Sequence, residues 1–200
     1  EKQRQDFDKL AALILKKHPG HTPVLLTRLH RLDEESRRKT RLPEIIAAAD
    51  ALLATVDREK LARTLGTRGA GQGQKEILVD ALYRKGRALA YMELPDVVNK
   101  RPIKDKPAHD KAFRDNFTEL KRWADTTDKK FVLLHIRAER RRGRQAIALK
   151  WLNKSSANSP PNYWYAKKRR DLFDELGWQH CSELAERWLL IKFPKNYESF

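Results

Sequence analysis

Apolar residues recur at helical spacing along nearly the whole chain. Near the N-terminus they occupy positions i, i+3, i+4, i+7 and i+8, at Phe7, Leu10, Ala11, Ile14 and Leu15, which is one stripe of an α-helix. Equivalent stripes follow within residues 25–32, 45–56, 77–89, 113–123, 131–136, 147–152, 172–176 and 181–188. No segment has a convincing β-strand pattern. The sequence therefore predicts an all-α fold.

The connections between these stripes are short, which favours stacked antiparallel helix pairs. Such pairs build an α-solenoid of the tetratricopeptide-like kind. Small residues, which helix pairs need where they cross, are present at Ala81, Gly86, Gly143 and Ala146. The tetratricopeptide consensus itself is not met, so the pattern indicates the architecture and no particular repeat family.

Several residues are candidates for the ends of helices. Thr22 before Pro23, and the side chains of Asp57 and Asp128, are N-cap candidates. Gly66 and Gly177 are placed to close the helices before them. Four of the eight glycines lie within residues 66–73, which predicts a flexible loop there.

The chain divides at a charged segment that contains Pro102 and Pro107. We expect an N-terminal helical bundle at residues 1–95, a linker at 96–111 and a C-terminal helical repeat with an aromatic tail at 112–200. The chain begins with Glu1 and has one methionine, Met92. We therefore expect it to be a piece of a longer polypeptide or a processed product.

The expected compartment is the cytoplasm. No apolar run approaches the roughly 20 residues that span a bilayer, and residues 1–10 are too polar for a signal peptide. The single cysteine, Cys181, allows no disulfide within the chain, which fits a reducing environment.

Motifs for cofactor or metal chemistry are incomplete. The loop at 66–73 lacks the Gly-Lys-Ser/Thr ending of a phosphate-binding loop. His18, His21 and His30 have no cysteine or carboxylate pattern to complete a metal site. His180 and Cys181 are adjacent, but successive helical residues point about 100° apart. We expect a buried, inert thiol, and neither a cofactor nor a metal site.

Basic residues are clustered between residues 131 and 170, where eleven Lys and Arg face a single acidic residue, in a chain whose formal net charge is +16. Phosphate contacts, a nuclear-import signal, a solvated helix face or contacts with acidic neighbours are all compatible with such clusters, and we favour the last two. The predicted basic patch comprises Arg137, Arg140, Arg141, Arg142, Arg144, Lys167, Lys168, Arg169 and Arg170.

Aromatic residues are concentrated at the C-terminal end. Trp188 shares a helical stripe with Cys181, Leu184 and Ala185, which we expect to face the preceding helix. The aromatic tail from Phe193 to Phe200 is expected either to fold back onto a helix or to dock on another domain or subunit. The resulting interface candidates are Trp178, Trp188, Phe193, Tyr197 and Phe200.

Two stretches carry a family resemblance. The C-terminal one has a Gly-Trp-x-His-Cys helix, a Trp-Leu pair and a Pro-x-x-Tyr-x-x-Phe tail, at residues 177–181, 188–189 and 194–200. The upstream one is the run Val-Asp-Ala-Leu-Tyr-Arg-Lys-Gly at residues 79–86. Both stretches, in this order and rough spacing, resemble the C-terminal region of the tripeptidyl-peptidase II family.

The resemblance implies a very large cytosolic serine exopeptidase that removes tripeptides from the N-termini of oligopeptides, including products of the proteasome. It also implies a helical C-terminal region that takes part in building large homo-oligomers. The family's Gly-Thr-Ser-x-Ala nucleophile signature does not occur in this chain. No catalytic residue carries over, and the expected partners are other domains and copies of the same polypeptide.

Three hypotheses of function follow. The first is an assembly and scaffold domain of such a peptidase. The second is a basic helical module that binds nucleic acid or an acidic protein partner. The third, an independent enzyme, is the least favoured because no pair of nucleophile and base is visible in the sequence. No membrane partner is expected.

Overall fold

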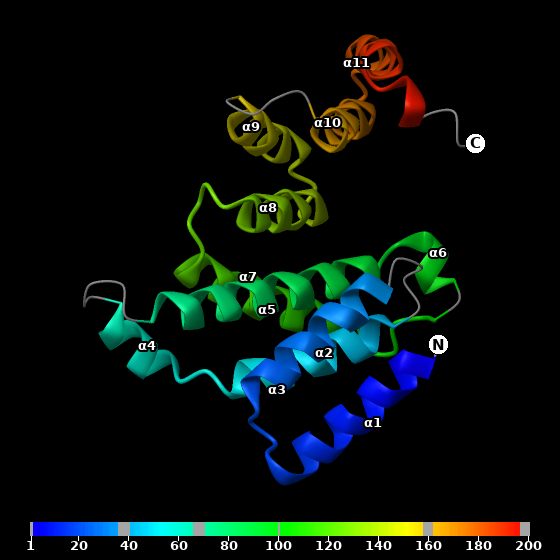
Figure 1. Ribbon diagram of the computed structural model, residues 1–200. Coiled ribbons are helices and arrows are strands. Elements are labelled where there is room, and N and C mark those ends of the chain that lie inside the picture. The colour runs from blue at the N-terminus through cyan, green and yellow to red at the C-terminus, as the bar shows by residue number, and fades with distance from the viewer. Residues whose placement is uncertain (1, 36–40, 66–70, 100, 158–161, 197–200) are drawn as a thin grey trace. The chain divides into compact units, whose positions relative to one another are not determined.

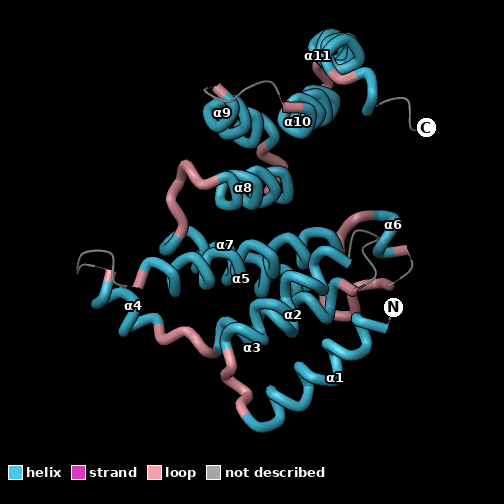
Figure 2. Tube along the Cα trace, viewed as in Figure 1, coloured by secondary structure: helices cyan, strands magenta, loops and turns pink. Residues whose placement is uncertain are grey.

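All regular structure in the described part of the chain is helical. The computed structural model describes residues 2–35, 41–65, 71–99, 101–157 and 162–196, and no strand occurs among them (Figures 1 and 2). The predicted all-α class is confirmed. The chain forms two compact units, residues 1–124 and 125–200.

The first unit is arranged around its longest helix, α5. Its helices are α1 (Lys2–Lys17), α2 (Thr22–Glu35), α3 (Leu42–Ala54), α4 (Arg58–Thr64), α5 (Gln72–Tyr91), α6 (Pro95–Val98) and α7 (Lys106–Trp123). Helix α5 packs against α2, α3 and α7, while α1 packs against α2. Ile45, Leu52, Leu78, Leu82 and Leu120 are fully buried where these helices meet.

Polar contacts fix α5 against its neighbours. The Asn116 side chain of α7 donates a hydrogen bond to the carbonyl oxygen of Leu82 over 2.9 Å. On the α2 side, Asp80 lies 2.8 Å from the His30 ring, and Arg84 bridges Asp80 and Asp33. The buried Asn116 and Asp80 specify how the helices align, because a buried polar atom left without a partner is costly.

The second unit is a chain-order stack of four helices. It consists of α8 (Lys129–Arg141), α9 (Gln145–Ser156), α10 (Tyr163–Glu175), α11 (Gln179–Lys192) and the short 3-10 helix η2 (Pro194–Asn196). Helix α8 packs on α9, α9 on α10, and α10 on α11. This chain-order packing resembles a solenoid. In the first unit, by contrast, α5 packs against α2, α3 and α7, which are not its neighbours in sequence. The stacked-pair architecture of the whole chain stays a prediction.

The predicted helix ends are partly confirmed. Asp57 and Asp128 cap α4 and α8, accepting hydrogen bonds from the amides of Lys60 and Lys130. Gly177 follows α10 with a φ of 72°. Thr22 is the first residue of α2 rather than its cap. Gly66, together with most of the predicted loop at 66–73, lies outside the described residues, and α5 already begins at Gln72.

The segment expected to be a linker contains part of two helices. Helix α6 ends at Val98, and α7 begins at Lys106, with Asp105 as its N-cap. Residues 96–111 therefore lie within the first compact unit, whose limit falls at residue 124. Compact units are defined by contacts and not by independent folding, so the predicted domain limits stay a prediction.

Candidate interaction surface on helices α10 and α11

Helix α11 packs on α10 through one face only. Leu189 is fully buried and Ser182 is buried on that face. Arg170 of α10 also reaches Glu186 of α11 over 2.5 Å.

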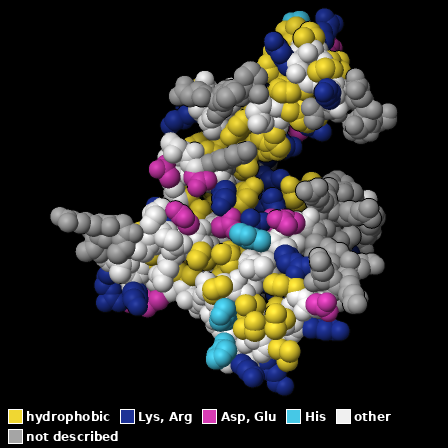
Figure 3. Space-filling view, viewed as in Figure 1, with side chains coloured by type: hydrophobic (Ala, Val, Ile, Leu, Met, Phe, Trp, Pro, Cys, Tyr) yellow, Lys and Arg dark blue, Asp and Glu magenta, His cyan; other side chains and the backbone are white. Residues whose placement is uncertain are grey.

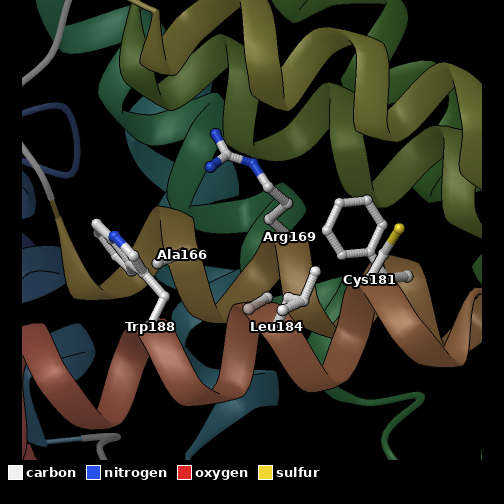
Figure 4. Close-up of a pocket in the computed structure, with 7 residues that line it drawn as sticks. Ala166, Arg169, Cys181, Leu184 and Trp188 are labelled. Carbon is white, nitrogen blue, oxygen red and sulfur yellow. The ribbon is translucent and has the colours of Figure 1, made fainter.

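A second apolar face of α11 borders an open groove. Ala166, Arg169 and Phe173 of α10 form one wall of this groove, and Cys181, Leu184, Ala185 and Trp188 of α11 form the other. Its volume is about 340 Å³. Cys181, Leu184 and Trp188 project from the same side of α11, as Figure 4 shows. We call this feature the α10–α11 groove.

The outer side of α11 is uncovered. Leu184 is 51% exposed, Trp188 38% and Ile191 75%. Hydrophobic side chains, with Lys and Arg among them, lie at the surface over α11 (Figure 3). The stripe of Cys181, Leu184 and Trp188 faces α10 as expected, but the prediction that Cys181 and this stripe are buried is wrong. It borders α10 only along the groove, and Cys181 is half-buried.

The aromatic candidates lie at the two ends of α11. Trp178 is 49% exposed and stacks on Phe173, with 6.0 Å between ring centroids. Phe193 packs edge-on against both Tyr163 and Trp188, each with 5.7 Å between centroids. Phe193, at the end of α11, thus contacts both α10 and α11, and the role of the tail beyond it stays a prediction. Tyr197 and Phe200 lie outside the described residues.

The predicted basic patch is engaged within the chain. Arg140 pairs with Glu175, and Arg142 and Arg144 pair with the buried Glu139. Arg137 and Arg141 also have partners within the chain.

The basic residues of α10 are likewise engaged. Lys168 and Arg170 pair with Asp171, and Arg169 donates to the side-chain oxygens of Asn153 and Ser156. Lys167 lies over the ring of Tyr163. These contacts fit the interpretation of a solvated, paired helix face better than that of a polyanion site.

The charges of Lys168, Arg170, Asp171 and Glu186 form a linked cluster between α10 and α11. The hydrogen bond to Glu186 raises the pKa of Arg170 above its usual value, against the effect of burial. Burial alone would raise the pKa of Asp171, but the hydrogen bond from Arg170 and the charge of Lys168 outweigh it and lower that pKa. The cluster joins α10 to α11 at neutral pH.

Nothing in the described residues assembles a chemical centre. No three His, Cys, Asp or Glu side chains within the described ranges are grouped as ligands for a metal ion. The same ranges contain no helix with the length and apolar character needed to cross a membrane. The groove offers shape and apolar area rather than reactive groups.

One residue of this surface was missed in the sequence. Ile191 lies seven residues after Leu184, and Trp188 lies seven after Cys181. This heptad spacing, which is typical of a helix that pairs with another helix, was the available signal. Leu10 and Leu13 on α1 of the first unit are also exposed.

The fold and the groove define an all-helical module with an open apolar surface on its last long helix. No protein-family model matches the chain, and no solved structure matches it. Over its whole length the chain is similar to tripeptidyl-peptidase 2 of Arabidopsis thaliana, with 28% identity over 217 residues. It is also similar to tripeptidyl-peptidase 2 of Oryza sativa subsp. japonica, with 30% identity over 220 residues.

These comparisons confirm the resemblance predicted from the two sequence stretches. The chain spans 16% of the length of each of these relatives.

Proposed function

We propose that the chain is the C-terminal assembly region of a giant, cytoplasmic, subtilisin-type serine peptidase that removes tripeptides from the N-termini of oligopeptides. Its part in that protein is to hold copies or domains together, and the catalytic residues belong to another region. The oligopeptides include products of the proteasome, and they bind only to the catalytic domain.

The observation that carries this proposal is the uncovered apolar face of α11. Leu184, Trp188 and Ile191 leave a large apolar area in water, and such area on a helix marks a contact surface. Helical stacks normally end in a helix with a polar outer face. The similarity to tripeptidyl-peptidase 2 indicates a longer polypeptide, whose other domains or copies are available to bind such a surface.

The competing hypothesis of nucleic-acid binding receives less support. The basic residues predicted to contact phosphate are held by carboxylates, amides or aromatic rings of the chain itself. Releasing them to bind phosphate would break these contacts. An acidic protein partner faces the same cost.

Deletion in the full-length polypeptide tests the proposal. A variant without residues 125–200, which form the second compact unit, is compared with the intact protein by sedimentation velocity and by turnover of a tripeptide substrate. We expect a smaller particle. A particle of unchanged size would contradict an assembly role for this unit.

A further inference from the structure

Cations border the uncovered apolar face of α11 on both edges. We call Leu184, Trp188 and Ile191 the open face of this helix. At 100° per residue, Arg187 lies roughly 60° from Leu184 on one side, and Lys192 lies roughly 80° from it on the groove side. Both cations are exposed, and neither forms an ion pair within the described residues. The open face therefore lies between two positive charges.

A third cation lies across the groove from the open face. Arg169 of α10 belongs to the wall opposite Trp188, and its guanidinium points away from α11 (Figure 4). Its Nε donates to the side-chain oxygen of Asn153 over 2.8 Å, and its Nη2 donates to the Ser156 hydroxyl over 2.9 Å. Both acceptors are neutral. Because a guanidinium has five N–H donors, Arg169 can bind a carboxylate and keep these two hydrogen bonds.

The two acids of α11 do not offset these charges within the described residues. Glu186 pairs with Arg170 of α10. Glu183 lies roughly 100° from Leu184, on the far side of Arg187. The surface thus combines apolar area with positive charge that has no acidic partner of its own. Arg187 and Lys192 also lie outside the predicted basic patch, so an acid that binds them breaks no ion pair of the described residues.

We propose that the α10–α11 groove and the open face bind an acidic amphipathic helix of the same polypeptide, from a region outside these 200 residues. An amphipathic helix binds such a groove by inserting apolar side chains at positions i, i+3, i+4 and i+7. The carboxylates that flank those side chains then pair with Arg169, Arg187 and Lys192. This inference rests on the proposed function, because it names the partner of the same surface.

Length and charge favour this source of the helix. The chain spans 16% of each tripeptidyl-peptidase 2 relative, so most of a polypeptide of that length lies outside it. A helix in the same polypeptide has a high effective concentration at the groove, and a weak contact then suffices. A second copy of this surface would bring its own Arg187 and Lys192 to the open face, and like charges disfavour that pairing.

Two labelled peptides test the chemistry of the partner by fluorescence anisotropy. Each is a helical peptide of about five turns with leucine on one face, and the flanking positions carry glutamate in one and lysine in the other. We expect the 200-residue chain to bind the glutamate peptide at least about tenfold more tightly. Leu184→Glu should weaken that binding by about tenfold or more. A chain that binds neither peptide, or both equally, would overturn the proposal.

Charge reversal on the surface tests where the peptide binds. Lys192→Glu should weaken binding of the glutamate peptide by about fivefold and strengthen binding of the lysine peptide. The matched control is Lys150→Glu on α9, which changes the same net charge at an exposed position of the same unit. It should alter neither dissociation constant by more than about twofold. Equal effects of the two variants would attribute the attraction to the net charge of +16 and refute the site.

Carbodiimide cross-linking of the full-length protein tests the source of the helix. This reagent joins a lysine amine to a carboxylate in contact with it. In particles assembled from isotopically light and heavy copies, we expect Lys192 to be joined to an Asp or Glu outside the 200 residues, always within one copy. Lys192→Arg keeps the charge and should abolish this product. A product that joins light to heavy copies, a product with another protein, or no product at Lys192 would contradict the proposal.

The two proposals fail separately. If neither peptide binds but deletion of residues 125–200 still reduces the full-length particle, the acidic helix is refuted and the assembly function stands. If the glutamate peptide and the cross-link behave as expected but the deletion leaves the particle unchanged, the assembly function is refuted and the acidic helix stands.

Discussion

Gly71 holds the start of α5 in a backbone conformation that other residues rarely adopt. Its φ is 93°, and a Cβ atom there would lie 2.8 Å from the Thr64 hydroxyl and 3.1 Å from Leu61. The hydroxyl cannot turn away freely, because it donates to the carbonyls of Lys60 or Leu61. We expect Gly71→Ala to lower the free energy of unfolding by about 1–2 kcal/mol, measured by urea denaturation.

Gly73 is the matched control for that substitution. It lies two residues further along, inside α5, with no atom within 4 Å of its Cβ position. Gly73→Ala should be neutral or stabilise the protein by up to about 1 kcal/mol. If both substitutions destabilise equally, the left-handed conformation of Gly71 is not the cause.

Asp171 makes the second unit sensitive to acid. Its pKa is lowered in the folded protein by Arg170 and Lys168, against the effect of burial. A lowered pKa contributes stability above the unfolded-state value of about 3.9, and that stability is lost as the pH falls through the folded-state value. Asp171→Asn should therefore cost about 1 kcal/mol at pH 7, with the difference shrinking below about pH 4.

Unfolding curves of wild type and variant from pH 7 to pH 3 measure this effect. The exposed Asp174, three residues further on, provides a comparison. Asp174→Asn should change the free energy of unfolding by less than about 0.5 kcal/mol. A cost of Asp171→Asn that is constant across this pH range would show that the charge of Asp171 is not involved.

At the scale of the helix, Asp105 determines where α7 begins. Its side chain accepts a hydrogen bond from the amide of Ala108 over 2.9 Å. We expect Asp105→Ala to cost about 1 kcal/mol and Asp105→Ser to restore most of it. Asp115→Ala removes the same charge from an exposed pair with Lys111 and should cost less than about 0.5 kcal/mol. Equal losses would attribute the effect to charge rather than to capping.

The start of α7 was missed because its inward face begins with a polar residue. His109 is buried one turn before Phe113 and pairs with Glu93 over 3.3 Å. Apolar periodicity detects the helix only from Phe113 onward. The combination of Asp105 with Pro107 is a helix-start signal, but it lay in a segment whose charge and prolines indicated a linker.

Periodicity located α11 correctly and turned its apolar stripe toward α10, but it did not show that this stripe stays open. The helix has apolar residues on two faces, and the hydrophobic pattern does not say which one the preceding helix covers. The structure buries Leu189 and the small Ser182 against α10 and leaves Leu184 and Trp188 at the groove. Whether an apolar face is covered within the chain or by another molecule is a tertiary property, which a single sequence does not encode locally.

For the whole molecule, we expect no peptidase activity. The 200-residue chain should not release tripeptides from a chromogenic Ala-Ala-Phe substrate, because no serine in its sequence has the signature of an activated nucleophile. Turnover that survives removal of contaminants and disappears on substitution of a serine in this chain would contradict the expectation.

The chain should bind nucleic acid weakly, and its affinity should fall as the salt concentration rises. The formal charge of +16 attracts polyanions, and affinity that comes from phosphate neutralisation falls steeply as salt rises. Fluorescence anisotropy with single-stranded and duplex probes between about 50 and 200 mM salt measures this. Tight binding of one defined sequence at the upper end would favour the nucleic-acid hypothesis instead.

The lone thiol gives the molecule a built-in reporter. Cys181 is the single cysteine of the chain and lies half-buried in the wall of the α10–α11 groove. Its alkylation rate therefore reads out groove occupancy with no engineered label. If alkylation of Cys181 is fast in dilute protein and slows as the protein concentration rises, a contact between chains is covering the groove. If alkylation stays slow in the full-length particle, the groove is permanently filled.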